Sequence, residues 1–377
     1  MIQVASIDLD DLSAESRGDP SGMGGHIAAF PLRVLQGWNG VAALALPDEY
    51  RAVRHVVVQG MGGSAIAGDI AAEAVDSLRE PGTAGAQISV FRDYGAHPSV
   101  GPDSLVVVMS HSGRTEEALS GVEASRLRGA KLIVMTGGGQ LGETARDMGI
   151  PIAMLPENGG PPRTYLPYAL GAMLRIFVDL GIALPNTERA LIDAVTELES
   201  RQPDFDASCN RTENGRVNPA KDLARALSGR IPVIVSARGL ASAARRWKTQ
   251  VNENAKTPAW TEELPEMHHN AIVGFEQTNL SDNLAIVLLG PPSTAPNSLH
   301  DRYAISRRIL RDLGVPVHWP ALSGETPLAR LLEAVLLGDY VSYYMALVNG
   351  IDPTPTVPLD SIKAQIRRST QNENHGE

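Results

Sequence analysis

The chain has little cysteine, little positive charge relative to negative charge, and no long uncharged hydrophobic run, and each of these features excludes or disfavours a class of protein. It has one cysteine, Cys209, which excludes an intrachain disulfide framework and is typical of a protein in a reducing cytoplasm. It has no excess of positive charge, because 33 basic and 43 acidic residues give a formal net charge of −10. Nucleic-acid-binding proteins normally present a basic face, so this composition disfavours that class. A local phosphate site remains open, since such a site uses backbone N–H groups.

The chain also lacks a long uncharged hydrophobic run. Its first residues contain neither a basic stretch nor an apolar one, so we expect no signal peptide and a cytoplasmic protein. The apolar segment 165–184 contains Arg175 and Asp179, which indicates a buried helix rather than a membrane span. Hydrophobic residues make up 43% and charged residues 20% of the chain, as in a well-packed globular protein, and 377 residues suffice for about two domains.

Short β-branched runs recur along both halves of the chain, and helical patterns separate them. In the first half they are 55–59, 105–109, 131–135 and 151–155, and in the second 232–236, 285–289 and 315–319. Continuous apolar strands that alternate with helices are typical of parallel sheets covered on both faces. We therefore predict an α/β protein with two doubly wound domains in tandem: residues 1–160, a helical connection and linker over 161–215, and residues 216–377. The strand–turn–helix segments 56–64 and 233–242 resemble each other and indicate an internal duplication.

Two turns in the first half have the composition of a phosphate site. The segment 60–64 is Gly-Met-Gly-Gly-Ser and runs from a strand into a helix, where Gly63 and Ser64 can offer N–H and hydroxyl donors. Its glycine spacing does not match the dinucleotide pattern. The turn after the next long strand carries Ser110, Ser112 and Thr115. Both turns lie at carboxyl ends of parallel strands, where ligands bind, although Thr115 could also serve only to cap the next helix.

The second half carries a carboxylate and a histidine in polar segments. Glu253 lies in what reads as the start of a helix, and His269 follows beyond Pro265, so the two lie on different elements and could face one pocket. His269 could equally be a hydrogen-bonded loop residue. A metal site at His268 and His269 is disfavoured because adjacent histidines do not both face one ion. Arg163 opens a helix after a Gly-Gly-Pro-Pro loop, and Lys363 reads as a solvated helical residue.

These motifs together resemble those of the bifunctional phosphoglucose/phosphomannose isomerases, which belong to the sugar isomerase (SIS) domain superfamily. The resemblance covers nearly the whole chain and lies in the segments 62–69, 110–117, 246–256, 263–270, 272–274 and 350–354. It implies an aldose–ketose isomerase that interconverts glucose 6-phosphate and mannose 6-phosphate with fructose 6-phosphate. It also implies a tandem SIS fold, a homodimer with the site at the subunit interface, and no metal or other cofactor.

The same resemblance implies roles for individual residues. Gly63, Ser64, Ser110, Ser112 and Thr115 correspond to phosphate ligands. Glu253 corresponds to the base that moves a proton between C1 and C2 through a cis-enediol, and Arg163 to the group that stabilises the enediolate. His269, reaching the site from the neighbouring subunit, and Lys363 correspond to the ring-opening pair. Thr356 corresponds to a threonine that lets the site accept both C2 epimers.

Four positions depart from the common family pattern. His111 stands where an aromatic residue is usual, Arg114 and His268 stand in place of asparagine, and Ala271 replaces an acidic residue. None of these changes removes a proposed catalytic group, and the first two border the phosphate turn and bear on sugar preference. Two other readings stay open: a narrower SIS phosphosugar isomerase, and a sugar-phosphate-sensing module without catalysis. A sensor would keep the phosphate turn and lack the acid–base residues, whereas this chain has Glu253, His269 and Lys363.

Overall fold

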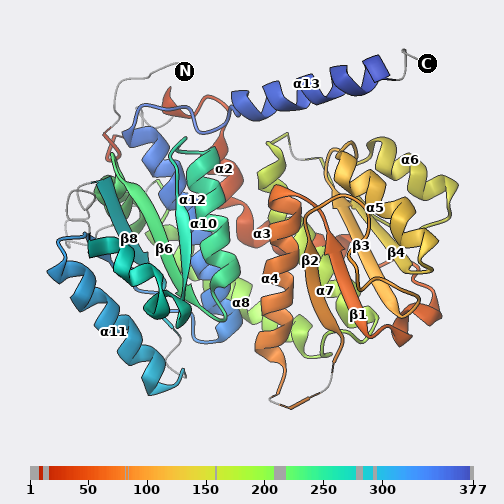
Figure 1. Cartoon of the computed structure of the whole chain (residues 1–377), viewed down its shortest axis with the longest axis horizontal. Coiled ribbons are helices and arrows are strands. Elements are labelled where there is room, and N and C mark those ends of the chain that lie inside the picture. Colours follow the sequence, from red (N-terminus) through yellow and green to blue (C-terminus); the bar gives the residue numbers. More distant parts are fainter. Residues whose placement is uncertain are drawn as a thin grey trace.

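The protein contains two parallel sheets, each flanked by helices (Figure 1). The structure is a computed structural model that describes residues 8–11, 17–80, 82–83, 85–157, 159–207, 218–276, 283–291 and 295–373. The strand orders are β2-β1-β3-β4-β5 and β7-β6-β8-β9, so the second sheet repeats the order of the first four strands. The predicted α/β fold with two parallel-sheet units is confirmed, and the matching strand orders support the inferred duplication.

The first sheet follows from strands that are buried on both faces. Every residue of β3 is buried, and its neighbours β1 and β4 are nearly as apolar. The strands are β1 (His55–Gln59), β2 (Gln87–Phe91), β3 (Ser104–Ser110), β4 (Lys131–Thr136) and β5 (Ile152–Met154). Helices α4 (Gly62–Leu78), α5 (Glu116–Leu127) and α6 (Gly139–Asp147) connect them. Because β1 pairs with β3 in parallel register, the turns that follow these two strands meet at one edge of the sheet.

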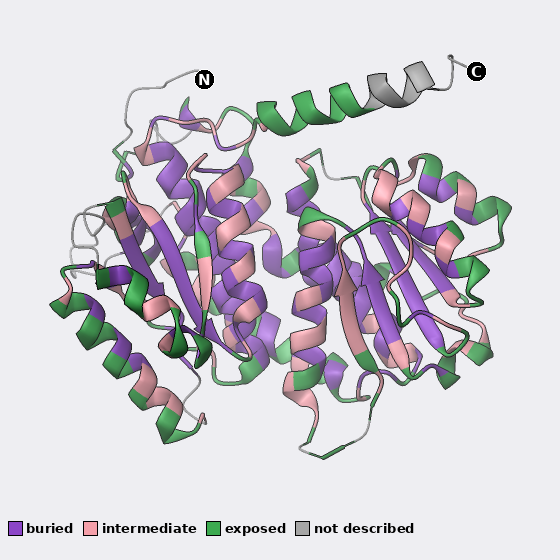
Figure 2. Ribbon diagram, viewed as in Figure 1, coloured by how far each residue is buried: buried purple, intermediate pink, exposed green. Residues whose placement is uncertain are grey.

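The second sheet is built in the same way. Its strands are β6 (Ile231–Ala237), β7 (Trp260–Leu264), β8 (Leu284–Leu288) and β9 (Val317–His318). Helices α9 (Pro219–Leu227), α10 (Ala241–Glu253) and α11 (Asn297–Asp312) flank it. Figure 2 shows buried strands at the centre of each unit, and helix α11 with an exposed outer face.

The sequence did not predict strands β2 and β7. Both lie beside the first strand of their sheet, at its edge, and neither has the continuous apolar run of a central strand. An edge strand needs fewer buried side chains, so a search for apolar β-branched runs misses it. Leucine 264 is the one buried residue of β7, whose sequence is Trp-Thr-Glu-Glu-Leu.

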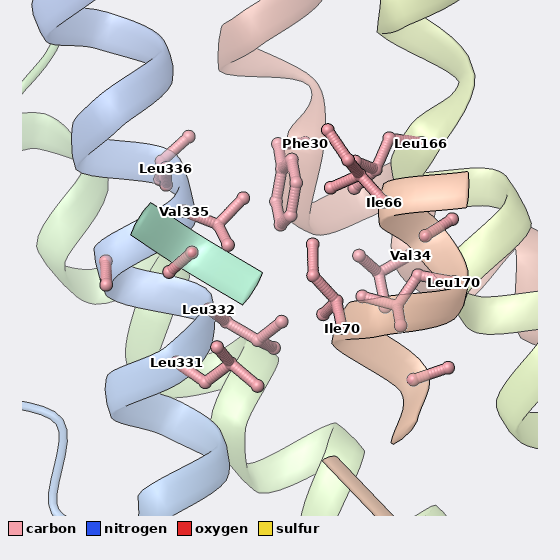
Figure 3. Packing of buried hydrophobic residues seen from close by; sticks show 14 of the residues in the cluster. Phe30, Val34, Ile66, Ile70, Leu166, Leu170, Leu331, Leu332, Val335 and Leu336 are labelled. Atoms are coloured by element: carbon pink, nitrogen blue, oxygen red, sulfur yellow. The ribbon is translucent and has the colours of Figure 1, made fainter. Parts of the chain in front are cut away.

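Helices between and around the sheets form one large core. They are α2 (Met23–Ala28), α3 (Phe30–Gly40), α7 (Leu166–Asp179), α8 (Thr187–Arg201) and α12 (Pro327–Val348). In Figure 3, Phe30 and Ile70 lie on one side of this core, and Leu332 and Val335 of α12 lie on the other. This packing joins the two units through apolar side chains. Of the described residues, only α12 is long and apolar enough to cross a membrane, and 94% of its apolar window is buried inside the protein.

The largely polar N-terminal segment 8–25 reads in sequence as a peripheral or disordered end, yet it takes part in this core. Leu9 is 1% exposed and Met23 is fully buried. The prediction was wrong because two isolated apolar residues among polar ones give no periodic signal. Residues 372–377 also read in sequence as a peripheral or disordered end. Helix α13 (Val357–Glu373) includes the first two of them, and the others lie outside the described residues.

Helices α4 and α10, the first helices of the two units, also meet through polar contacts. Glu73 of α4 accepts hydrogen bonds from the backbone N–H groups of Ala241 and Ser242, each at 3.1 Å. These N–H groups are at the start of α10 and have no partner within the helix, so the carboxylate accepts their hydrogen bonds. Its negative charge also interacts favourably with the positive end of the helix dipole. Burial raises the pKa of Glu73, while the hydrogen bonds from Ser242 oppose that rise. The contact fixes the start of the helix that ends at Glu253.

Candidate active site

The first predicted phosphate turn lies between β1 and α4. Gly62 has φ +51°, and α4 begins there, so Gly63 and Ser64 occupy its first turn. That turn contains no acidic residue, which leaves the helix N-terminus favourable to an anion. A Cβ atom on Gly63 would lie 3.5 Å from the Cα of Arg163. The turn therefore passes directly against the segment that carries the arginine.

The second turn lies between β3 and α5. Ser110 is the last residue of β3 and is buried, Ser112 is exposed, and the two flank the turn. The hydroxyl groups of Ser110 and Thr115 are 2.8 Å apart. Thr115 is the residue before α5, but its side chain makes no capping hydrogen bond there. Its hydroxyl is thus directed to the turn and not to the helix.

A tight backbone contact holds the second turn in place. Gly113 has φ +62°, and a Cβ atom there would lie 1.8 Å from the carbonyl oxygen of Gly138. Only glycine fits this position. Next to it, the His111 ring stacks on Tyr165 with centroids 3.4 Å apart, and burial lowers the pKa of His111. His111 therefore joins the turn to the short helix η2 (Pro162–Tyr165) that carries Arg163, whereas the second unusual residue of the turn, Arg114, is exposed.

Arg163 and Glu253 form the centre of the site. Arg163 is 3% exposed, and its Nη1 lies 3.4 Å from Oε2 of Glu253. The glutamate side chain is 27% exposed, so it is the accessible member of the pair. Burial lowers the pKa of Arg163 below its ordinary value, and Glu253 partly offsets this effect. The guanidinium nevertheless stays charged, as arginine does in proteins.

The position of Glu253 corrects one expectation. Its polar surroundings read as the start of a helix, whereas it is the last residue of α10. Helix α10 has buried residues up to Val251 and then ends in the polar sequence 252–254. The error arose because polar residues surround both kinds of helix end. As expected, Arg163 does open a helical segment, since η2 leads into α7.

Hydrogen bonds fix the orientation of Arg163 on every side. Its Nε donates to Asn254 at 2.8 Å, and its Nη2 donates to the carbonyl oxygens of Pro353 and Thr354 at 2.7 and 3.0 Å. These partners come from the end of α10 and from the segment before α13. The guanidinium therefore joins three parts of the chain that are distant in sequence.

A second buried ion pair supports the first. Arg246 binds both carboxylate oxygens of Asp339 at 2.8 and 2.9 Å, and its Nη2 also donates to the carbonyl oxygen of Arg163 at 3.1 Å. Both side chains of this pair are under 5% exposed. Asn254 donates to Ser342 at 2.9 Å. Helix α12, which provides Asp339 and Ser342, thus acts as the rigid base of the site.

Two further polar residues at the centre were not singled out from the sequence. Lys256 has φ +53°, and its Nζ donates to the carbonyl oxygens of Glu253 and of Pro353. Burial and the charge of Arg163 lower the pKa of Lys256 to about 8. The hydroxyl of Thr354 is buried and has no partner among the described residues. The sequence offered one signal for Lys256, because it is a charged residue three positions after Glu253 within the segment 246–256.

The remaining expected residues do not reach this centre within one chain. His269 is exposed at the end of η4 (Glu266–His269), and Lys363 is exposed on α13. Neither makes a hydrogen bond or ion pair with Arg163 or Glu253 in the described part of the chain. Thr356 is half-buried just before α13, and its carbonyl accepts the N–H of Asp360 at 3.1 Å. Figure 1 shows α13 extending along the outside of the molecule.

The neighbours of His269 explain why it is exposed. His268 occupies the inward position, where its ring nitrogens contact Ser306 at 2.7 Å and Arg302 at 3.2 Å. Ala271 begins the next short helix, η5 (Ala271–Glu276), and is half-buried. His269 is left facing solvent with no partner among the described residues.

The fold and these turns define a tandem SIS-domain protein. The SIS domain signature matches residues 49–169. Solved structures with this fold include the C-terminal domain of glucosamine-fructose-6-phosphate aminotransferase from Francisella tularensis. That chain superposes with a TM-score of 0.62 at 15% identity, covering 89% of this chain and 98% of its own. The tagatose-6-phosphate ketose/aldose isomerase of Escherichia coli gives a TM-score of 0.59 at 14% identity over 88% and 95% of the two chains.

Closer relatives narrow this class to one family. The signature described as "Bacterial phospho-glucose isomerase C-terminal SIS domain" matches residues 216–366. A bifunctional phosphoglucose/phosphomannose isomerase from Aquifex aeolicus is 33% identical over 88% of this chain and 94% of its own length. One from Caldicellulosiruptor bescii is 34% identical over 82% and 89%. The chain belongs to the bifunctional phosphoglucose/phosphomannose isomerase family.

Proposed function

We propose that this protein is a cytoplasmic aldose–ketose isomerase that converts both glucose 6-phosphate and mannose 6-phosphate to fructose 6-phosphate. The observation that carries the proposal is the fixed, buried Arg163 beside the accessible carboxylate of Glu253, in a chain of this family. The reaction proceeds through a cis-enediol and needs no metal ion. Conversion of each aldose to fructose 6-phosphate by the purified protein is the direct test.

The chemistry assigns separate tasks to the two central residues. Glu253 removes a proton from one of the carbons C1 and C2 and returns it to the other, as a general base and then a general acid. Arg163 meets the negative charge that develops on the enediolate oxygens without losing a proton of its own. Its hydrogen bonds to Asn254, Pro353 and Thr354 hold it ready before the charge appears. The ion pair with Arg163 holds Glu253, the base, in position before substrate binds.

The phosphate group occupies the two turns of the first sheet. Gly63 and Ser64 provide the N-terminus of α4, and Ser110, Ser112 and Thr115 provide hydroxyl groups from the adjacent turn. Binding energy from this distant phosphate places C1 and C2 beside Glu253. The close approach of Gly63 to Arg163 makes the two regions parts of one site.

Replacing Ser112 with alanine tests the phosphate turn. We expect KM to rise about three- to tenfold, the effect of about one lost hydrogen bond, with a smaller change in kcat. Steady-state kinetics with glucose 6-phosphate measure both constants. Ser200→Ala is the matched control because Ser200 is an exposed serine of α8, and it should leave KM unchanged. An unchanged KM in Ser112→Ala would place the phosphate elsewhere.

The working form is a homodimer in which each site takes a residue from the other subunit. Two observations support this arrangement: His269 faces solvent, and helix α13 exposes the side chains of Val357, Leu359, Ile362 and Ile366. Of these, Leu359, Ile362 and Ile366 recur at the spacing of one helix face, and an exposed apolar helix face is typical of a protein–protein contact. In the dimer, His269 of the neighbouring subunit and Lys363 open the sugar ring, and Thr356 lets the site accept both C2 epimers.

Mixed dimers test the origin of His269. Glu253→Gln and His269→Ala are each expected to inactivate the dimer when present in both subunits. Co-expression with two different purification tags yields dimers that hold one subunit of each kind. If His269 acts across the interface, one site of the mixed dimer has both wild-type residues and activity returns. Activity that stays absent in the isolated mixed dimer would show that His269 acts within its own subunit.

A further inference from the structure

A cavity lies beside the second sheet, and neither Arg163 nor Glu253 lines it. Its volume is about 860 Å³, which is within the range of small-molecule sites. It runs along β9, the edge strand of this sheet, and its walls come from α9, α11 and the start of α12. No residue given a role in the isomerisation lines it.

The charge of this cavity is opposite to that of the whole protein. Arg307, Arg311 and Arg330 line it, although the chain has a formal net charge of −10. Arg307 and Arg311 are one turn apart on α11 and have no carboxylate partner in the part of the chain that the structure describes. Asp222 is the one acidic residue in the lining, and it pairs with Arg225 at 3.2 Å. The cavity therefore favours an anion.

His318 and Arg330 add polar groups to the lining of the cavity. Nε2 of His318 and Nε of Arg330 are both buried and have no hydrogen-bond partner among the described residues. Burial lowers the pKa of His318, and the charges of Arg230 and Arg311 lower it further. His318 thus lies within the positive field of the arginines. A water molecule cannot reach Nε2 of His318 or Nε of Arg330, so these two nitrogen atoms add to the polarity of the lining without touching a ligand in the cavity.

An aromatic wall completes the cavity. Trp319 is half-buried, and its ring is held against Tyr303 with centroids 5.6 Å apart and planes 34° apart. Trp319 lines the same cavity as Arg307 and Arg311. Two exposed arginines one helical turn apart and an indole held against Tyr303 suit a ligand that has both a phosphate and a ring.

The edge of β9 is unsuited to the other plausible occupant, an added peptide strand. In the first sheet β5 pairs with the outer edge of β4, while no strand of the described residues pairs with the outer edge of β9. Strand β9 has only two residues, and Pro316 and Pro320 flank it. Short strands flanked by proline are poor templates for a further strand. The space beside β9 is therefore better suited to a compact small molecule than to a peptide strand.

We propose that this cavity binds a small organic phosphate, with the phosphate on Arg307 and Arg311 and the ring against Trp319. The site is separate from the proposed isomerase site and does not depend on it. The phosphate receives charge-assisted hydrogen bonds from the two guanidinium groups.

Isothermal titration calorimetry of the whole protein with AMP tests the proposal. A parallel titration with inorganic phosphate measures the affinity for the anion alone. The double variant Arg307→Gln/Arg311→Gln should bind AMP at least about tenfold more weakly than the wild type, as expected when two charge-assisted contacts are lost. Arg308→Gln is the matched control, because Arg308 is an exposed arginine of the same helix outside the cavity. Both proteins should keep wild-type isomerisation kinetics.

The wild type, the double variant and Arg308→Gln share the same isomerase site, so AMP bound there contributes equally to all three titrations. Differences in AMP affinity among the three proteins therefore report on the cavity. Equal AMP affinity in the double variant and the wild type would overturn the proposal. Equal weakening in the double variant and in Arg308→Gln would also overturn it, because general surface charge would then explain the binding. AMP that binds no more tightly than inorganic phosphate would contradict the part assigned to Trp319.

Discussion

Glu253→Gln is expected to lower kcat by about 10²- to 10⁴-fold, the usual contribution of a positioned general base. The amide has nearly the same shape as the carboxylate but cannot accept the proton from the substrate carbon. Glu253 is at the end of α10 with its side chain 27% exposed, so the substitution should leave the fold intact. Substrate binding should change little, because the phosphate turns lie on the other sheet. Steady-state kinetics and calorimetric binding of fructose 6-phosphate measure the two effects.

The control for this variant is Glu199→Gln, an exposed glutamate of α8 that should leave kcat unchanged. Loss of exchange between substrate and solvent protons would show that the missing step is proton abstraction. A Glu253→Gln protein that turns over at the wild-type rate would remove Glu253 as the base. Equal loss of turnover and of binding would instead assign it a role in holding the substrate.

Arg163→Lys is expected to lower kcat by about 10²- to 10³-fold, the usual cost of losing one donor to a developing oxyanion. Lysine keeps the charge, but a single ammonium group cannot contact Asn254, Glu253 and the carbonyls of Pro353 and Thr354 together. The carbonyl oxygen of Thr354 and the side-chain oxygen of Asn254 would each lose the donor that Arg163 provides, while the carbonyl of Pro353 would keep Lys256. We therefore also expect a lower melting temperature.

Two measurements separate these effects. Thermal unfolding monitors stability, and kcat measured well below the melting temperature monitors catalysis on folded protein. Arg175→Lys is the control, since Arg175 forms a half-exposed pair with Asp179 within α7 and should change both quantities little. A folded Arg163→Lys protein with wild-type kcat would contradict the assigned role of Arg163 in stabilising the enediolate.

The central strands and the edge strands β5 and β9 were predictable from the sequence, while the edge strands β2 and β7 were not. Runs such as 55–59 and 131–135 match β1 and β4 because a central parallel strand is apolar on both faces. Strands β2 and β7 lack that pattern, since each has only one neighbouring strand and is largely open to solvent. The register of β1 with β3, which brings the two phosphate turns together, also required the structure.

The site was predictable only as far as its residue types. Hydroxyl groups at Ser110 and Thr115 were visible in the sequence, but their mutual contact was not. The contacts of Arg163 join residues about 90 and 190 positions away, and no local pattern encodes such separations. Lys256 was overlooked because one lysine in a polar segment has no distinctive pattern. In the proposed homodimer His269 reaches the site from the neighbouring subunit, and no local pattern in one chain encodes that arrangement.

The measurement that tests the account most directly is the formation of fructose 6-phosphate by purified, EDTA-treated protein. Glucose 6-phosphate and mannose 6-phosphate are offered separately, and the rates are compared with those of the Glu253→Gln variant. The account predicts that the wild-type protein converts both sugars without added metal and that the variant converts neither at a comparable rate. Conversion of glucose 6-phosphate alone would contradict the dual specificity. Conversion of neither sugar, with fructose 6-phosphate still bound, would contradict the isomerase assignment and favour a sugar-phosphate-binding module.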